Sequence, residues 1–151
     1  MILVRAAGPS DRPALASMAV AAASDISHHR GGPGLLETWL GDRDQAEALE
    51  ASEEKLAGRL HQLFVAVNEE EALGLALAAL GPSAGFVALF VRPEARRQGA
   101  GHQLSASALA WLESSGVGSI DTIALPGDRE MKNLWEQAGF KARLLTLRRD
   151  G

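Results

Sequence analysis

An apolar segment, Phe86–Val91, runs directly into a loop rich in arginine and glycine. An apolar run of this length is typical of a strand buried on both faces. Gly99 and Gly101 let backbone N–H groups of the loop turn towards one point, and they leave room for a ligand. A helix is predicted over Gly101–Ser114, and its partial positive end faces the same point. The segment therefore predicts an anion site, although a tight glycine turn without a ligand has the same spacing.

Two phosphates would suit this loop. Arg96, Arg97 and His102 add positive or hydrogen-bonding groups beside it. The loop is not a Walker motif, because no Gly-Lys-Ser/Thr follows it. It is not a dinucleotide-binding fingerprint either, because the residue three after Gly101 is Leu104.

The composition is that of an ordinary soluble globular protein, and it excludes several classes of function. With 151 residues, 46% of them hydrophobic and 23% charged, we expect one domain spanning residues 1–151. No apolar run is long enough to span a membrane, and the N-terminus lacks the pattern of a signal peptide. We therefore expect a cytoplasmic protein with no membrane partner. The net charge of −4 argues against a general nucleic-acid surface. The absence of cysteine excludes a thiolate zinc site and a cysteine acyl carrier.

The first part of the sequence predicts one strand and then helices. Ile2–Ala7 has the pattern of a strand, and Ser10 is a candidate N-cap for the helix that follows. Asp25–Gly34 breaks the helical spacing and is predicted to be a loop. A second helical stretch, in one piece or two, begins near Leu35 or near Asp42.

The rest of the sequence predicts a hairpin and then alternating strands and helices. Asp128 is a good N-cap for a helix that stops at Gly139, where glycine suits the left-handed closing residue. The order of the elements predicts a mixed α/β domain. The further predicted strands span Gln62–Val67, Ala72–Leu80, Phe86–Val91, Ser119–Leu125 and Phe140–Leu147.

Three segments match the motifs of one known superfamily, in the same order along the chain. Val91–Gly101 reads V-R-P-E-A-R-R-Q-G-A-G and resembles V-x-P-x-x-R-x-x-G-x-G. Val4–Ala7, with Asp11 and Leu15 behind it, resembles an opening strand and helix, and Asp128–Phe140 resembles the helix N-x-x-A-x-x-L-Y-x-x-x-G-F. These are motifs of the GCN5-related N-acetyltransferases, the GNAT superfamily. The resemblance covers essentially the whole chain and implies a GNAT-like α/β fold of about six strands and four or five helices, with splayed central strands.

The resemblance also implies where acetyl-CoA would bind. The strands Phe86–Val91 and Ser119–Leu125 would splay apart, with the pantetheine arm in the gap. Backbone groups of Val91 would hold the pantetheine amides, and the N–H of Leu89 would polarise the thioester carbonyl. The positions that the resemblance assigns to coenzyme A are Leu89, Phe90, Val91, Arg96, Arg97, Gln98, Gly99, Ala100, Gly101, His102, Asp128, Lys132 and Trp135.

Two catalytic side chains that are usual in this superfamily are missing here. The usual general acid is a tyrosine, but the chain has no tyrosine and has Trp135 at that position. An indole N–H donates a hydrogen bond but cannot deliver a proton. We therefore expect Trp135 to pack near the thioester, with core packing alone as the alternative. The usual glutamate base is also absent from Phe86–Val91. A remote base acting through water, an amine that binds already neutral, and an inactive site all stay open.

The predicted loop Asp25–Gly34 offers candidates for the acceptor site, because by family analogy it borders the acceptor pocket. His28 and His29 are candidate bases, since imidazole titrates near neutral pH. Asp25 could instead bind a substrate ammonium group. The alternative is a polar surface loop without a catalytic role. The spacing of these three residues does not make a zinc site, and no metal is expected.

The sequence therefore predicts an N-acetyltransferase that moves an acetyl group from acetyl-CoA directly to a primary amine of a small molecule or a protein. The alternative is a non-catalytic acyl-CoA-binding sensor or regulatory domain that lacks a general acid. The predicted strand Phe140–Leu147 would leave an open sheet edge near the cleft. A second subunit could cover that edge, which makes a homodimer a further hypothesis.

Overall fold

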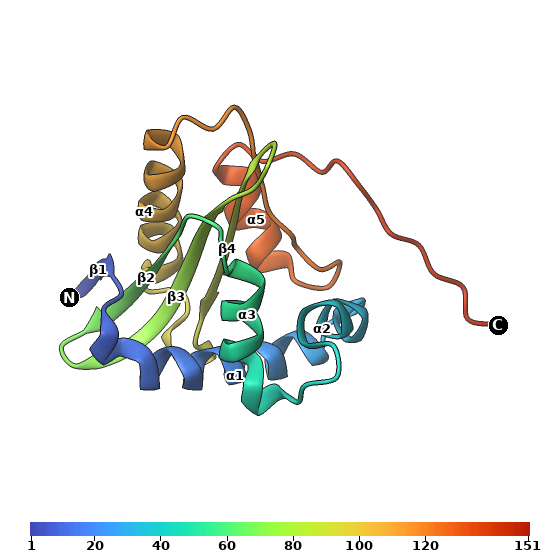
Figure 1. Cartoon of the computed structure of the whole chain (residues 1–151), viewed down its shortest axis with the longest axis horizontal. Coiled ribbons are helices and arrows are strands. Elements are labelled where there is room, and N and C mark those ends of the chain that lie inside the picture. The colour runs from blue at the N-terminus through green and yellow to red at the C-terminus, as the bar shows by residue number, and fades with distance from the viewer.

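The computed structural model describes residues 1–151 and contains one mixed sheet with helices on both faces (Figure 1). This confirms the predicted mixed α/β fold, with five strands in place of about six. None of the helices combines the length and the apolar character needed to cross a bilayer. The strands are β1 (Ile2–Ala6), β2 (His61–Asn68), β3 (Glu71–Leu80), β4 (Gly85–Val91) and β5 (Ile120–Asp121). The helices are α1 (Arg12–Ser27), α2 (Gly32–Leu40), α3 (Ala48–Leu56), α4 (Ala100–Ser114) and α5 (Arg129–Gln137).

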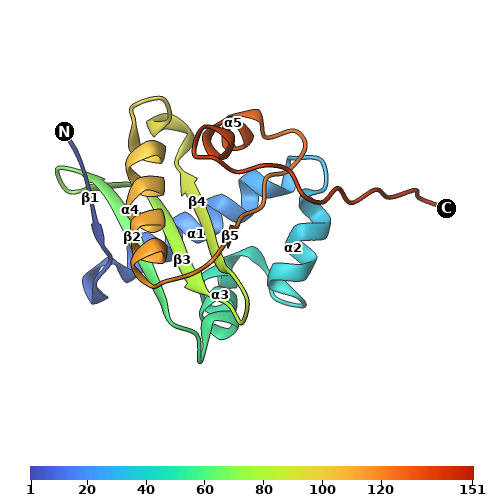
Figure 2. The ribbon, with the colours of Figure 1, turned by 90° about the horizontal axis from the view of Figure 1, so that it is seen from above.

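The sheet has the order β1-β2-β3-β4-β5. The first four strands are antiparallel to their neighbours, and the predicted hairpin is β2–β3. β5 runs parallel to β4 and pairs with it only at Gly85–Ile120 and Phe86–Asp121. Beyond these two pairs the chain leaves β4, so most of the length of β4 has no neighbour on that side. The view from above shows the chain after β5 diverging from β4 (Figure 2).

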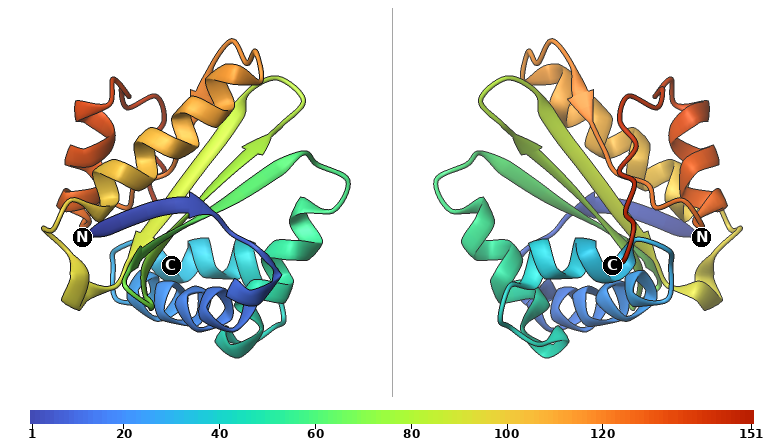
Figure 3. Two further views of the ribbon diagram at one scale, coloured as in Figure 1. Left: turned by 90° about the vertical axis from the view of Figure 1, so that its left-hand side faces the viewer. Right: turned by 90° about the vertical axis from the view of Figure 1, so that its right-hand side faces the viewer.

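The helices form two layers around the sheet. α1, α2 and α3 lie on one side, and α4 and α5 lie on the other (Figure 3). Successive side chains of a strand point to opposite faces, so Val65 belongs to the core beneath α1 and Ala66 to the core beneath α4. Met18 and Leu104 are fully buried, one in each core. Each side chain contributes about 2–3 kcal/mol by its burial.

The end of α1 differs from the sequence prediction. Asp25–Gly34 was expected to be a loop, but α1 continues through Ser27 and α2 begins at Gly32. The hydroxyl of Ser27 donates to the carbonyl oxygen of Ser24 at 2.6 Å, which fits serine into the helix without a break. Pro33 lies in the first turn of α2, where its missing N–H interrupts no hydrogen bond. The helical stretch that follows is in two pieces, α2 and α3.

Two predicted strands are shorter or absent. The segment Ser119–Leu125 contributes only Ile120–Asp121 to the sheet, because Thr122 then turns its hydroxyl onto the carbonyl oxygen of Val87 at 2.6 Å. The predicted strand Phe140–Leu147 is not formed. Its residues have no regular structure, and the chain runs from α5 to a point beyond α2 (Figures 1 and 2). A strand requires ladder hydrogen bonds from a neighbour, and no backbone hydrogen bond joins residues 141–151 to the rest of the chain.

The ends of α5 are as predicted. The carboxylate of Asp128 accepts a hydrogen bond from the backbone N–H of Met131 at 3.2 Å. Gly139 follows the helix with a φ of 96°, a conformation that glycine adopts without strain. These two residues set the position of α5 beside the end of β4.

Candidate active site

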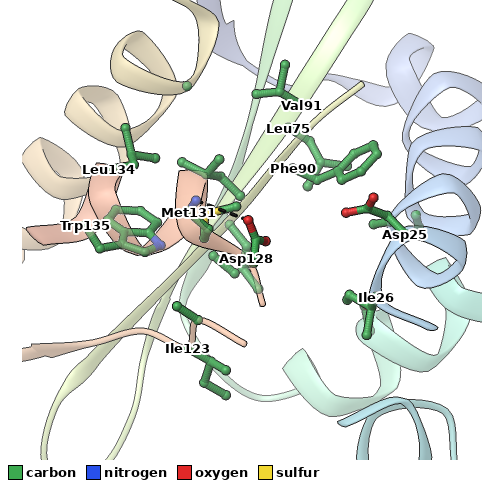
Figure 4. Close-up of a pocket in the computed structure, with 18 of the residues that line it drawn as sticks. Asp25, Ile26, Leu75, Phe90, Val91, Ile123, Asp128, Met131, Leu134 and Trp135 are labelled. Atoms are coloured by element: carbon green, nitrogen blue, oxygen red, sulfur yellow. Dashed lines mark hydrogen bonds between the residues drawn. The ribbon is translucent and has the colours of Figure 1, made fainter. Parts of the chain in front are cut away.

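A cleft of about 810 Å³ passes through the gap between β4 and the segment after β5 (Figure 4). On one side of the gap it reaches the start of α4, residues Ile123–Leu125 and α5; we call this part the loop arm. On the other side it extends over the sheet beneath α1, α2 and α3; we call this part the sheet arm. The close-up shows Leu134 and Trp135 on the α5 side, opposite Asp25 and Ile26 of α1 (Figure 4).

Beside the loop arm lie six consecutive backbone N–H groups, those of residues 97–102, that donate no hydrogen bond within the chain; all but Gln98 belong to residues that line the cleft. We call these residues the cradle. The last three belong to the first turn of α4, where an α-helix leaves N–H groups without partners. The partial positive charge of the helix end adds to them. Together they form a site that suits an anion such as a phosphate.

The backbone conformation of the cradle keeps it open. Gly99 has a φ of 93° and Arg97 has a φ of 66°, which is an uncommon conformation for a residue with a side chain. A Cβ atom at Gly99 would meet nothing within 4 Å. A Cβ atom at Gly101 would lie 3.9 Å from the side chains of Leu134 and Val91, which is ordinary contact. Glycine at position 101 therefore leaves space in the cleft that a longer side chain would fill.

The two arginines before the glycines have different surroundings. Arg96 donates from Nε to the carbonyl oxygen of Val91 at 3.0 Å and from Nη2 to the carboxylate of Asp25 at 3.3 Å. Its guanidinium also lies 5.8 Å from the centre of the Phe90 ring. Arg97 is largely exposed and pairs with Glu130 at 3.4 Å. Arg96 is thus held by the protein itself.

The backbone of β4 faces the gap at alternate residues. The N–H of Arg92 donates to the carbonyl oxygen of Leu73 in β3. Hydrogen-bonded pairs alternate in an antiparallel ladder, so Phe90 bonds to β3 while Leu89 and Val91 turn their backbone groups the other way. Because the chain has left β4 at this level, these groups face the cleft. Leu89 and Val91 both line it.

Trp135 brings a buried polar group to the cleft wall. Its side chain packs edge-on against Phe140, with ring centres 5.2 Å apart, and only 2% of the residue is exposed. The indole Nε1–H is buried and has no hydrogen-bond partner. Buried donors without partners are rare in proteins, because each costs about 1–3 kcal/mol. The indole N–H is therefore available to a group that enters the cleft.

The other predicted coenzyme A residues divide into those that line the cleft and those that do not. Phe90, Ala100, His102 and Asp128 line it, and the carboxylate of Asp128 already caps α5. Gln98 and Lys132 do not line the cleft. Both are exposed, and Lys132 forms an ion pair of 3.7 Å with Glu136.

The predicted acceptor residues are only partly brought together. Asp25 lines the cleft, but its carboxylate is shared between Arg96 and the imidazole Nε2 of His29, 3.6 Å away. Neither His28 nor His29 lines the cleft. The ring nitrogen Nδ1 of His28 lies 2.7 Å from the carbonyl oxygen of Ser24, at the exposed end of α1. A catalytic role for the two histidines stays a prediction.

The sequence prediction did not assign the sheet arm. Its floor consists of alternate residues of three neighbouring strands, which all point to the α1 face. Period-two alternation in the hairpin could have indicated one such face, but not which helices cover it. The floor residues are His61 and Leu63 of β2, Leu75, Leu77 and Ala79 of β3, and Phe86, Ala88 and Phe90 of β4.

The sequence of residues 15–140 matches the model of the acetyltransferase (GNAT) family, and the chain belongs to this family. The match includes β4, the cradle, α4 and α5. This confirms the superfamily that the three motifs indicated and makes the chain a member of a family of acyltransferase enzymes. No curated protein sequence matches the chain significantly.

Solved structures share this fold at low sequence identity. A Pyrococcus furiosus protein assigned as an acetyl transferase has a TM-score of 0.74 and 20% identity, and the match covers 99% of both chains. A predicted acetyltransferase from Clostridium acetobutylicum, solved with acetyl-CoA, has a TM-score of 0.71 and 17% identity over 99% of this chain and 96% of that one. AAC(6')-Iy, solved with the bisubstrate analogue CoA-S-monomethyl-acetylneamine, has a TM-score of 0.65 and 18% identity over 100% and 99%.

Proposed function

We propose that the protein transfers an acetyl group from acetyl-CoA to a primary amine. The observation that carries this proposal is the row of free backbone N–H groups at residues 97–102, placed directly beside the gap next to β4. A diphosphate needs several donors at one point, and a pantetheine arm needs a narrow passage with free backbone groups. Both requirements are met in one continuous cleft. The acetyl-CoA and CoA complexes among the structural neighbours support the choice of ligand.

Each part of the loop arm has a proposed task. The N–H groups of the cradle bind the two phosphates, and Arg96 positions the cradle through its contacts with Val91 and Asp25. The free N–H group of Val91 and the free backbone groups of Leu89 bind the amides and the thioester end. His102 and Asp128 border the path of the nucleotide end. Trp135 offers its buried N–H at the opposite wall.

The transfer is proposed to be direct. The thioester of acetyl-CoA supplies the activated acetyl group. The chain has no cysteine that could accept an acyl group as a covalent intermediate. The N–H of Leu89 stabilises the negative charge that develops on the carbonyl oxygen during attack, a contribution of about 3–4 kcal/mol for a well-placed donor.

We propose that the leaving thiolate is protonated without a tyrosine acting as general acid. The side chains of β4 contain no titratable group, and an indole cannot protonate a thiolate at neutral pH. We propose that the amine attacks as the neutral species and forms the new C–N bond while the C–S bond breaks. The nitrogen loses one proton and the thiolate gains one, either by direct transfer or through a water molecule that accepts the first proton and donates the second. The Trp135 N–H lowers the energy of the thiolate by donating a hydrogen bond to it.

We also propose that two copies of the chain associate. β5 has no neighbour on its outer edge, and Leu144, Leu145 and Leu147 of the C-terminal segment are 78–89% exposed. Open strand edges and exposed apolar side chains both favour association. A second copy of the chain carries the same open β5 edge and the same exposed leucines, so the two copies can cover these surfaces on each other.

The test is a calorimetric titration with acetyl-CoA followed by a free-thiol assay with a panel of amines. We expect binding that is lost in Gly101→Glu and thiol release that depends on both the amine and the enzyme. No binding at millimolar acetyl-CoA would overturn the proposal. Binding without thiol release for any amine would favour the acyl-CoA sensor instead.

A further inference from the structure

We infer that the acceptor is an amine with an apolar body and an anionic group at the end remote from the amine. This inference rests on the proposed function, because it takes the sheet arm as the acceptor site. It is carried by three independent features of that arm: an apolar floor, carboxylates that already have partners, and cations that do not.

The sheet arm is apolar on two sides. Seven of the eight floor residues named above are apolar, the exception being His61 at the start of β2. The roof consists mainly of apolar side chains of α1 and α3, including Leu15, Leu49 and Leu56. Each methylene group of an acceptor buried here gains about 0.8 kcal/mol. The walls therefore favour an acceptor with an extended apolar body over a small or strongly polar one.

Every carboxylate that lines the cleft already has a partner. Asp25 pairs with Arg96 and His29, and Glu130 pairs with Arg97. Glu53 accepts two hydrogen bonds from the guanidinium of Arg12, which lower the pKa of its carboxyl group. Asp128 caps α5. A polycationic acceptor would find no free carboxylate for its additional ammonium groups, and desolvating unpaired charges is costly.

Basic side chains without an ion pair gather at the end of the sheet arm that lies farthest from the cradle. Lys55, Arg59 and His61 line the cleft where α3 ends and β2 begins, and none of them forms an ion pair. The Nδ1 atom of His61 lies 2.9 Å from the carbonyl oxygen of Arg59, which leaves its Nε2 atom without a partner. Three cationic or hydrogen-bonding groups without a protein carboxylate suit an anion of the ligand.

The register of the sheet sets the length of the acceptor. His61 lies opposite Ala79, and Ala79 lies opposite Phe86, three residues before Leu89 on β4. At about 3.3 Å per residue and about 4.8 Å per strand, the anionic end lies about 10 Å along the sheet and about 10 Å across it from Leu89. The long side chains of Lys55 and Arg59 can shorten this span. An apolar chain of several carbons between amine and anion fits it.

The experiment compares three acceptors of equal length: octylamine, 8-aminooctanoate and 1,8-diaminooctane. Free thiol is measured at saturating acetyl-CoA, after calorimetry has established the affinity for acetyl-CoA. We expect kcat/KM for 8-aminooctanoate to exceed that for the diamine at least tenfold and that for octylamine about threefold. In the double variant Lys55→Glu/Arg59→Glu we expect the diamine to become the better acceptor, with unchanged affinity for acetyl-CoA. The control Lys141→Glu/Arg143→Glu makes the same change of charge outside the cleft and should keep the wild-type order.

The outcomes separate this inference from the proposed function. The inference would be overturned if the wild-type protein preferred the diamine, or if the double variant kept the wild-type order of kcat/KM among the three acceptors. In either case thiol release would still support acetyl transfer. Binding of acetyl-CoA with no reaction of any of the three amines would overturn it as well. Absence of acetyl-CoA binding would instead overturn the proposed function on which it rests.

Discussion

Asp25 near the end of α1 accepts a hydrogen bond of 3.3 Å from Arg96, 71 positions later in the chain. Because Arg96 also donates to the carbonyl oxygen of Val91, this one side chain links α1, the end of β4 and the cradle. The side chains of Arg96 and Asp25 are 32% and 27% exposed, so the ion pair itself contributes at most about 1 kcal/mol. Its main effect is to fix the position of the cradle relative to α1.

Asp25→Asn should therefore weaken the binding of acetyl-CoA about two- to fivefold, because Arg96 loses a contact that positions the cradle before the ligand binds. The KM for an amine should not change, since the carboxylate is already paired. Calorimetry and amine titrations measure the two effects. Glu130→Gln, which breaks the exposed ion pair with Arg97, is the control and should leave the affinity as it is. A higher KM with unchanged affinity would make Asp25 the site of the substrate ammonium.

Gly101→Glu should abolish binding of acetyl-CoA, because it places a negative side chain where the diphosphate is proposed to bind. The fold should survive, since a Cβ atom at this position meets its neighbours at 3.9 Å. Gly101→Ala is the matched control and should bind acetyl-CoA with a smaller loss. Calorimetry and thermal unfolding measure both. If Gly101→Glu bound acetyl-CoA as tightly as the wild type, the cradle would not be the binding site of the diphosphate.

Trp135→Phe should lower kcat about three- to tenfold with little change in affinity for acetyl-CoA, because it removes the buried N–H that has no partner and keeps an aromatic ring. The loss should be the same at every pH, since an indole does not titrate. Steady-state rates across the pH range measure this. An unchanged kcat would mean that Trp135 serves only the packing of the core.

Asp11 should make the stability of the fold depend on pH in acid. Hydrogen bonds from the guanidinium of Arg5 and from the backbone of Gly8 lower the pKa of its carboxyl group from 3.8 to about 2. A lowered pKa in the folded state means that the stabilisation is complete above pH 3.8 and is lost as the pH falls to about 2.

Thermal unfolding of wild type and Asp11→Asn measures this contribution. The difference in Tm between the two should be largest above pH 3.8 and should vanish near pH 2. Asp121→Asn, which removes an exposed carboxylate without a partner, should show no such trend. A difference that stays constant with pH would contradict the assignment.

Deletion of residues 141–151 should convert the proposed dimer into a monomer, because it removes the exposed leucines of the C-terminal segment. The fold should be retained, since no backbone hydrogen bond joins these residues to the rest of the chain. Light scattering at micromolar concentration measures the mass. A monomeric mass of the full chain would contradict the proposal.

Local sequence patterns predicted much of this fold. The alternating and apolar runs located the hairpin β2–β3 and β4, and the Asp128 cap with Gly139 placed α5 within a residue or two. The predictions that were wrong concern segments whose structure depends on distant neighbours. Phe140–Leu147 has residues suited to a strand, but strands form only where another strand supplies hydrogen bonds. Asp25–Ser27 remains helical because helix packing, rather than residue preference, decides such an end.

Glycine spacing and residue identity are local properties, so the amino-acid sequence was enough to indicate the family, the position of the cradle and the absence of the usual acid and base. Which groups are free to act depends on how the folded chain brings distant residues together. Hydrogen bonds and ion pairs join residues far apart in the chain, so the sequence could not indicate that Arg96 is occupied by Asp25 or that the indole N–H of Trp135 has no partner. The same reason applies to the sheet arm, where Lys55 and Arg59 line the cleft and form no ion pair.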